Sequence, residues 1–249
     1  MAPTLTPAEA VAANPVWYHT MELGSGAVTS GQIDMRGTAA KILPSDLTGK
    51  RALDIGTFDG FWAFEMEKRG AATVAIDVAK LEFAEWPPLN RARAEKQARE
   101  WGLELGRGFK LASEALRSSV ERIECPVQEL AVDRIDGEVD FVFSGDILLH
   151  LRDMVGALER IHSVLRPGGR VLVLEPVAVR ETILSPRRAV ARFEPLVTPF
   201  NWWVPNLKSI RGWLAAAGFV DIKRRGFHRP PARGPMRQWH VALEASPGA

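Results

Sequence analysis

The chain has 249 residues, 46% of them hydrophobic and 25% charged, which suits one globular α/β domain with a short appendage and excludes a disordered chain. Its formal net charge of +2 gives no electrostatic reason to expect a nucleic-acid or membrane partner, and no apolar run approaches the roughly 18 residues of a membrane span. A single cysteine, Cys125, excludes an intramolecular disulfide and a multi-cysteine zinc site, so a metal-independent protein is expected.

Residues 1–48 are predicted to form a short lid of helix and hairpin. The segment from Thr6 to Glu9 has capping-box spacing with proline at the first helical position, which predicts a helix to about Asn14. Residues 17–33 hold three glycines between apolar pieces and predict a hairpin or turns. A second helix is predicted over 36–43, before Pro44. No basic region precedes an apolar one here, so a cytoplasmic protein is expected.

Residues 49–249 alternate between strands and helices and are predicted to form the core domain. Helices are expected after capping residues at Asp59, Asp153 and Asn206. A charged helical piece is expected over 91–101, and the connection over 175–206 is far longer than the usual ~2–6 residues. The pattern predicts an α/β, doubly wound, Rossmann-like and mostly parallel seven-stranded sheet. Its strands are expected at 51–55, 73–77, 123–128, 139–144, 170–176, 219–225 and 238–245.

A glycine-containing turn, LDIGTFDG, joins the first core strand to the first core helix. Gly56 lets a ligand approach the backbone, and Gly60 allows close packing of the turn on the helix. Asp77 ends the next strand, where an acid accepts hydrogen bonds from both ribose hydroxyls. Phe58 replaces the middle glycine of a dinucleotide fingerprint and would crowd a pyrophosphate, which argues against NAD or FAD. The alternative is a turn that binds nothing.

Several motifs resemble those of class I S-adenosylmethionine-dependent methyltransferases, from about Thr48 to the C-terminus: LDIGTFDG, AID, DFVFSGDILLHL and LRPGGRVLVLEP. More narrowly, SDLTGKRALDIG and NLKSIRGWLAAAGFVDI resemble the family that contains the bacterial tRNA wobble-uridine carboxymethyltransferase and its methyltransferase relatives. The resemblance implies S-adenosyl-L-methionine as cofactor. It also implies that Asp54, Gly56, Phe58 and Gly60 cradle the methionine end, Asp77 binds the ribose, Val127 and Gln128 flank the adenine, and Ser144 and Gly145 line the inner wall.

The chain departs from the carboxymethyltransferase pattern at one position. The tyrosine that precedes the histidine after the fourth strand in that family is Leu149 here, before His150. In the family this tyrosine helps to hold the extra carboxylate of the cofactor, and the only tyrosine of this chain is Tyr18. Fewer than 50 residues precede the core, whereas the tRNA enzyme carries a long extension. These departures favour ordinary methyl transfer over carboxymethyl transfer to tRNA.

One basic stretch remains open to two interpretations. It is either a solvated connection between edge strands or a site for an anion, and the anion is an acidic small substrate or RNA. Its cations are Lys223, Arg224, Arg225, Arg229, Arg233 and Arg237.

Three segments reach the edge of the sheet where ligands bind in this fold, outside the carboxyl ends of the strands. His150 follows the fourth strand and is expected to be the general base, since an unperturbed histidine titrates at ~6.5; the alternative is that it braces the next helix. Glu175 ends the fifth strand and is a candidate to orient a hydroxyl. The remaining candidates for the acceptor site, each with core packing as the alternative, are Trp17, Tyr18, His19, Asn201, Trp202 and Trp203.

These observations predict transfer of a methyl group from S-adenosylmethionine to a small molecule. The expected acceptor is an oxygen of an aromatic or polyfunctional metabolite, which loses its proton to His150. The first alternative is a tRNA wobble-uridine methyl- or carboxymethyltransferase. The second is a protein that binds S-adenosylmethionine for regulation or for other chemistry. No nucleic-acid or membrane partner is expected, and the pattern does not define an oligomeric state.

Overall fold

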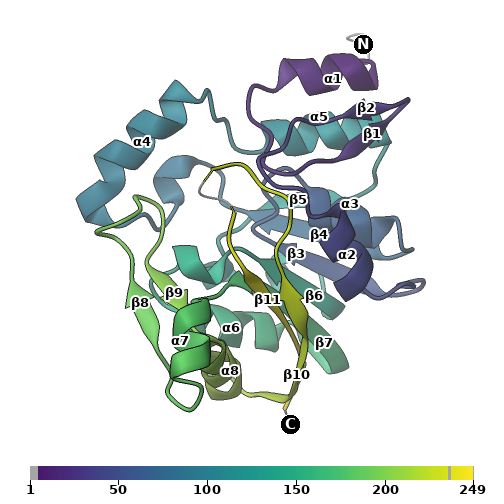
Figure 1. The fold of residues 1–249 in the computed structure, drawn as a ribbon. Coiled ribbons are helices and arrows are strands. Elements are labelled where there is room, and N and C mark those ends of the chain that lie inside the picture. The colour runs from purple at the N-terminus through teal and green to yellow at the C-terminus, as the bar shows by residue number, and fades with distance from the viewer. Residues whose placement is uncertain (1–4, 235–236, 249) are drawn as a thin grey trace.

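A seven-stranded sheet forms the centre of the computed structural model, which describes residues 5–234 and 237–248 (Figure 1). The strand order is β10-β11-β7-β6-β3-β4-β5; the five strands from β7 to β5 run parallel, and β11 is antiparallel to both of its neighbours. The predicted seven-stranded, doubly wound fold is therefore confirmed. The strands are β3 (Arg51–Ile55), β4 (Ala72–Asp77), β5 (Glu121–Glu124), β6 (Val139–Gly145), β7 (Leu165–Pro176), β10 (Phe219–His228) and β11 (His240–Pro247).

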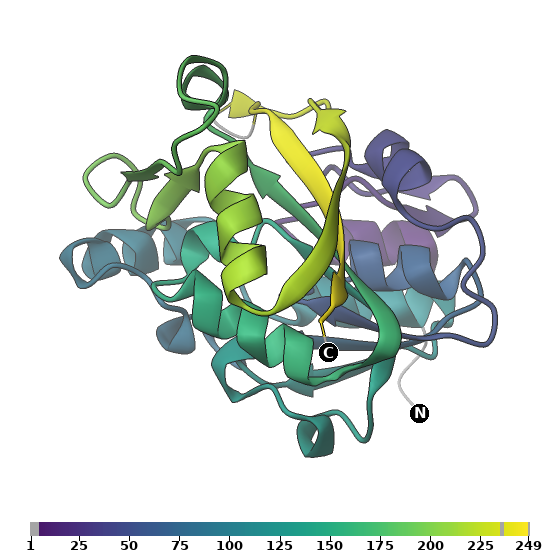
Figure 2. The same cartoon turned by 90° about the horizontal axis from the view of Figure 1, so that it is seen from below.

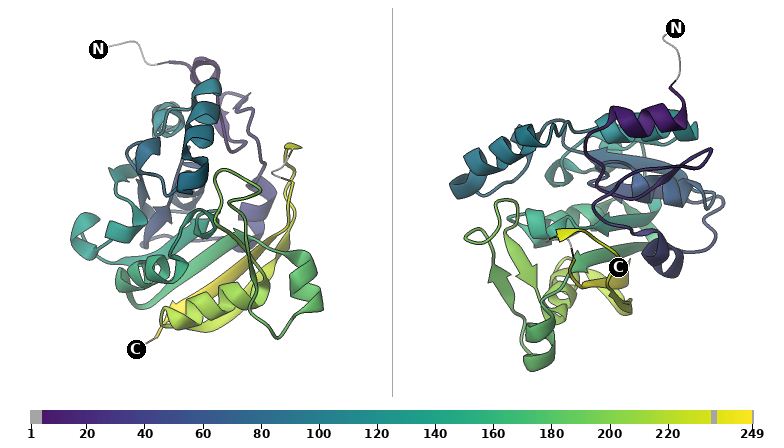
Figure 3. Two further views of the ribbon diagram at one scale, coloured as in Figure 1. Left: turned by 90° about the vertical axis from the view of Figure 1, so that its left-hand side faces the viewer. Right: turned by 45° about the horizontal axis from the view of Figure 1, so that its top comes forward.

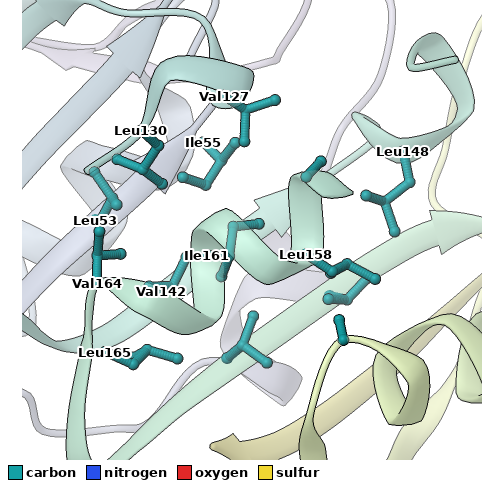
Figure 4. Close-up of a cluster of buried hydrophobic side chains, with 14 of the residues drawn as sticks. Leu53, Ile55, Val127, Leu130, Val142, Leu148, Leu158, Ile161, Val164 and Leu165 are labelled. Carbon is teal, nitrogen blue, oxygen red and sulfur yellow. The ribbon is translucent and has the colours of Figure 1, made fainter. Parts of the chain in front are cut away.

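Helices cover both faces of this sheet (Figure 2). On one face, α6 and α8 pack through Leu158, Ile161 and Ile210 onto strand residues such as Val142, as Figure 4 shows for α6. The other face is covered by α3, α5 and the N-terminal segment. The helices are α3 (Phe61–Glu67), α4 (Arg91–Glu100), α5 (Arg107–Leu116), α6 (Met154–Ser163), α7 (Val179–Leu184) and α8 (Leu207–Ala216).

The N-terminal segment has the predicted helix and hairpin. It contains α1 (Pro7–Ala13), the two-stranded hairpin of β1 (Glu22–Gly24) and β2 (Ala27–Val28), and α2 (Arg36–Ile42). The capping box at the start of α1 is present: the Thr6 side chain accepts from the Glu9 amide, and the Glu9 carboxylate accepts from the Thr6 amide. Trp17 is buried in the same apolar cluster as Phe61 and Phe143, so this segment shares a core with the sheet.

The long connection after β7 contains regular elements that the sequence did not predict. It contains α7 and an antiparallel hairpin of β8 (Ala191–Phe193) and β9 (Trp203–Pro205). The bounds of the strand expected over 123–128 are also wrong. β5 spans Glu121–Glu124, and a 3-10 turn follows at Val127–Glu129. The helix α5 was not predicted because the sequence around it lacks capping residues; its N-cap is Gly106.

Two insertions meet outside the carboxyl ends of the parallel strands. The first follows β4 and includes α4; the second is the β8–β9 hairpin (Figure 3). They are joined by a hydrogen bond from the Asn90 side-chain amide to the Pro195 carbonyl and by one from the Trp202 indole to the Glu85 carbonyl. We call these two segments, 81–101 and 191–205, the cap. No helix within the described ranges is long and apolar enough to cross a membrane.

Candidate functional site

The turn after β3 has the backbone shape that its two glycines allow. Gly56 has φ +68° and Gly60 has φ +89°, both in the left-handed region that favours glycine. The amides of Gly56 and Thr57 both donate to the Ile76 carbonyl, at 2.9 and 3.1 Å, which ties the turn to the neighbouring strand β4. Phe58 also has a positive φ, +49°, which is uncommon for a bulky residue and is found mainly at functional sites.

The prediction that Asp59 caps the first core helix is wrong. α3 begins at Phe61 with Gly60 as its N-cap and no side-chain cap. Asp59 is buried, and its Oδ2 accepts from the amides of Tyr18 (3.0 Å) and His19 (2.8 Å). Its Oδ1 lies 2.6 Å from His19 Nδ1. The carboxylate thus holds the N-terminal segment against the glycine turn instead of starting a helix.

Asp77 lies at the end of β4, as the sequence predicts. Its carboxylate accepts from the amides of Phe58 (2.9 Å) and Val78 (2.8 Å), so it is fixed beside the glycine turn. Burial raises the pKa of Asp77, and the hydrogen bond from Phe58 and the charge of Arg122 partly oppose that rise. A carboxylate oxygen has lone pairs for more than one donor, so ribose hydroxyls can be accommodated.

The segment expected to flank the adenine lies next to Asp77. Asp77 pairs with Glu124 in the sheet, and the Cys125 amide donates to the Asp77 carbonyl. Val127 and Gln128 follow in the 3-10 turn, with Val127 buried in the core cluster. Cys125 is fully buried, which fits the small apolar filler that the sequence predicts.

Buried polar side chains gather at the sheet edge, at the ends of the adjacent strands β3 and β6. Asp54 and Thr57 interact with each other, and Ser144 Oγ has no hydrogen-bond partner among the described residues. Burial raises the pKa of Asp54 to about 7. Because buried polar groups normally find partners, these side chains fit a ligand that brings polar and charged groups to this edge, as the methionine end of S-adenosylmethionine does.

Gly56 provides the space for such a ligand. A Cβ built at Gly56 would lie 2.0 Å from Ile147 Cδ1, so the Ile147 side chain covers the turn. Ile147 follows β6 and presents only the end of its side chain to Gly56, and a rotamer change is enough to uncover the backbone. Gly145, at the end of β6, borders this space from the side of Phe143.

Asp146 joins the N-terminal segment to the last strand of the sheet. Its Oδ2 accepts from the Tyr18 hydroxyl at 3.1 Å, and its Oδ1 lies 3.1 Å from Nε2 of the buried His240. Burial disfavours the charged form of both groups, but their mutual attraction and hydrogen bond oppose it. The pKa of Asp146 is therefore lowered and that of His240 is raised. Asp146 has φ +53°, a second strained non-glycine position at this edge.

His150 ends the short 3-10 helix that follows β6 (Leu148–His150). Its Nδ1 lies 3.0 Å from the carbonyl oxygen of Phe200 in the cap. A carbonyl only accepts, so Nδ1 carries the proton and the lone pair of the neutral ring is on Nε2. Burial lowers the pKa of His150, which keeps the ring neutral at pH 7. This arrangement provides a proton acceptor at the sheet edge.

Glu175 holds the same 3-10 helix in place. It is fully buried, and its Oε1 accepts from the amides of Ile147 and Leu148, both at 2.9 Å. Burial, followed by the negative charge of Asp146, raises the pKa of Glu175 to about 8. Its Oε2 has no hydrogen-bond partner among the described residues. Glu175 therefore fixes the loop that carries His150 and keeps one oxygen for another group.

The aromatic candidates over 201–203 belong to the cap. Trp202 donates from its amide to the Leu149 carbonyl (2.8 Å). The Arg152 guanidinium lies over the Trp202 ring, 5.2 Å from its centroid. Trp203 packs against Phe193 in the hairpin. Asn201 is half-buried, and its amide donates to Thr198 Oγ1. Trp202 is thus the candidate that the structure brings beside the His150 loop.

The basic stretch forms the outer strand β10 and the turn after it. Arg225 approaches Glu244 at 3.8 Å, Arg224 lies over Phe227, and Arg229 lies over Trp239. The Pro235–Met236 part of the stretch lies outside the described residues.

Two important residues of the site were missed in the sequence. His240 starts the closing strand β11, where pattern analysis sees only an apolar segment. Its contact with Asp146 depends on β11 pairing with β7, a long-range event. Ile147 was also missed, although it lies three positions before the candidate His150.

Comparison with known proteins identifies the family. A methyltransferase-domain family model matches residues 33–224. The chain is 30% identical over 182 residues to the tRNA U34 carboxymethyltransferase of Azotobacter vinelandii, covering 72% of this chain and 48% of that protein. It is 30% identical over 189 residues to that of Stutzerimonas stutzeri, covering 74% and 50%. The chain thus spans about half the length of these curated relatives.

Solved structures share the fold at low sequence identity. A Burkholderia thailandensis 1,6-didemethyltoxoflavin-N1-methyltransferase with bound S-adenosylhomocysteine aligns with a TM-score of 0.53 at 22% identity, over 86% of this chain and 78% of that one. A Haemonchus contortus phosphoethanolamine N-methyltransferase aligns with a TM-score of 0.57 at 16% identity, over 86% and 53%. The expected enzyme class and cofactor are supported by the family match and this shared fold. The chain is therefore a member of the methyltransferase-domain family, with the fold of S-adenosylmethionine-dependent methyltransferases.

Proposed function

We propose that this protein transfers the methyl group of S-adenosylmethionine to an oxygen of a small aromatic or polyfunctional metabolite. The observation that carries the proposal is the pairing of His150 Nδ1 with the Phe200 carbonyl. Because Nδ1 donates to this carbonyl, Nε2 of the neutral His150 ring is left as a base at the sheet edge beside the glycine turn. The cap, with Phe200 and Trp202, lies beside this base and offers flat apolar surfaces to an aromatic acceptor.

The cofactor supplies an activated methyl group, and the chain's residues position it and manage the acceptor proton. Asp77 would hold the ribose and the Gly56 turn the methionine end. His150 Nε2 would take the proton of the acceptor hydroxyl as its oxygen attacks. The Phe200 carbonyl stabilises the protonated ring that results, because Nδ1–H remains its donor. The rest of the rate acceleration comes from holding the donor and the acceptor in line.

A tRNA wobble-uridine enzyme is the second candidate, because the curated relatives at 30% identity are named tRNA U34 carboxymethyltransferases. Three features weigh against it. Leu149 stands at the family's tyrosine position, and Asp146 places a carboxylate at the transfer edge. On the basic strand β10, Arg225 already approaches Glu244 and Arg224 lies over Phe227.

A label-partition experiment tests the proposal. The protein is incubated with methyl-labelled S-adenosylmethionine and a cell extract, which is then split into low-mass, RNA and protein fractions. The proposal expects label in a low-mass product that survives ribonuclease treatment. Label confined to the RNA fraction would establish the second candidate instead.

A further inference from the structure

Two carboxylates follow neighbouring strands where the transfer site is expected. Asp146 comes directly after β6 and Glu175 lies at the end of β7. The two strands pair up to Gly145 and Leu174, and the Asp146 amide donates to the Leu174 carbonyl at 2.9 Å. Both side chains are buried or nearly so, with the Asp146 side chain 12% exposed and Glu175 0%. They therefore form one small acidic region at the sheet edge.

This acidic region faces the turn that is expected to hold the methionine end of the donor. Ile147 follows Asp146 in the chain, and its amide donates to Glu175. Its side chain covers Gly56. On the other side, Tyr18 reaches Asp146 with its hydroxyl and packs its ring on Phe58 at 5.7 Å. Ile147 and Tyr18 thus connect the acidic region to the glycine turn.

Several titratable groups interact with the two acids. They include Tyr18, His19, His150 and His240, of which only the histidines can carry positive charge. His240 and Tyr18 stabilise Asp146 as a carboxylate, whereas Asp146 and burial raise the pKa of Glu175 to about 8. Glu175 Oε2 is a buried oxygen with no hydrogen-bond partner in the described structure. A cation placed here would interact with Asp146 and would favour ionisation of Glu175.

We propose that Asp146 and Glu175 form an acidic subsite for the sulfonium of the donor, and that this subsite determines donor choice. The inference rests on the proposed function. During transfer the methyl carbon forms its bond to the acceptor oxygen as its bond to sulfur breaks, so the sulfonium becomes an uncharged thioether. The subsite therefore binds the donor more strongly than the product, S-adenosylhomocysteine. It also disfavours a donor with a carboxylate on the transferred carbon, because that carboxylate would lie beside Asp146.

Calorimetric titration with three probes tests this subsite without an acceptor. The probes are S-adenosylmethionine, S-adenosylhomocysteine and carboxy-S-adenosylmethionine. Wild-type protein should bind the first most tightly. Asp146→Asn should lower its preference for S-adenosylmethionine over S-adenosylhomocysteine by about five- to twentyfold, the scale of one charge-assisted contact, with product affinity nearly unchanged. The same variant should gain affinity for the carboxylated donor.

A matched variant separates the charge of this region from that of another carboxylate on the same strand. Asp140→Asn removes a carboxylate at the other end of β6, where it pairs with Arg166, and should leave all three affinities as in wild type. Thermal unfolding identifies any variant that does not fold, and Glu175→Gln then replaces Asp146→Asn with the same expected direction.

A proton-release measurement gives an independent readout. Titrations at pH 7 in buffers of different ionisation enthalpy should show more protons released on binding S-adenosylmethionine than on binding S-adenosylhomocysteine, and Glu175→Gln should remove the difference. Equal changes in both affinities on Asp146→Asn, with equal proton release, would overturn the subsite. If wild-type protein bound none of the probes, the proposed function itself would fail, which is a distinct outcome.

Discussion

The Tyr18 hydroxyl donates a hydrogen bond to Asp146 across 3.1 Å and joins the N-terminal segment to the end of β6. The next residue, His19, is held by Asp59 after β3. Two consecutive residues thus bind the two strand ends that flank the expected methionine site. We expect cofactor entry to require movement of this segment, as the prediction of a lid implies.

Loss of the Asp59 carboxylate should destabilise the protein. Asp59→Ala leaves the buried His19 ring and two amides without their acceptor, so the free energy of unfolding should fall by ~3–5 kcal/mol. Chemical denaturation measures this change. Asp46→Ala is the matched control, because Asp46 is exposed and accepts only from nearby Thr48, and it should change the free energy of unfolding far less. Equal losses in the two variants would contradict the lid contact.

The ion pair between His240 and Asp146 should give stability within a defined pH window. The pKa of His240 is raised above its ordinary 6.5, so its contribution is complete below pH 6.5 and is lost as pH rises through the higher folded value. The pKa of Asp146 is lowered below 3.8, so its contribution is present above pH 3.8 and is lost as pH falls through the lower folded value.

His240→Gln tests this window by denaturation at several pH values. The difference in unfolding free energy between wild type and variant should be largest between about pH 4 and 6.5 and should shrink at higher pH. His162→Gln is a suitable comparison, since His162 lies on α6 against Phe219 and Gly218. A difference that is the same at all pH values would show that His240 contributes packing alone.

Substitution of His150 should affect turnover more than cofactor binding. His150→Gln removes the base but keeps a hydrogen-bond donor for the Phe200 carbonyl, so kcat should fall by ~10²–10⁴-fold with cofactor affinity nearly intact. Because the pKa of His150 is lowered, the wild-type rate should rise with pH through a value below 6.5 that the variant lacks. These kinetics use the acceptor found by label partition. A rise in KM with kcat unchanged would assign His150 to acceptor positioning instead.

The sequence predicted those elements whose signals are local. Thr6, Asp153 and Asn206 cap their helices through bonds to amides three residues ahead, a spacing visible in one dimension. The apolar runs of β3, β4 and β6 are buried on both faces and were located nearly to the residue. The mostly parallel sheet with helices on its faces followed from the alternation of these elements.

What the sequence could not show are contacts set by distant pairing. Asp59 has the spacing of a helix cap, yet its partners lie 40 and 41 positions away in the lid. His240 reaches Asp146 only because β11 returns antiparallel beside β7. The hairpin of β8 and β9 was not predicted, because these two short strands have three residues each and little alternation.

Titration of S-adenosylmethionine into wild-type protein, Asp77→Ala and Glu121→Ala tests the central claim most directly. Asp77 lies at the end of β4 beside the glycine turn, whereas Glu121 is an exposed acid on the adjacent strand β5. Wild type and Glu121→Ala should bind with the same affinity, and Asp77→Ala should bind more weakly by ~1.5–3 kcal/mol, the scale of hydrogen bonds to a charged acceptor. Unchanged affinity in folded Asp77→Ala, or no binding by wild type, would contradict the assignment of this edge as the cofactor site.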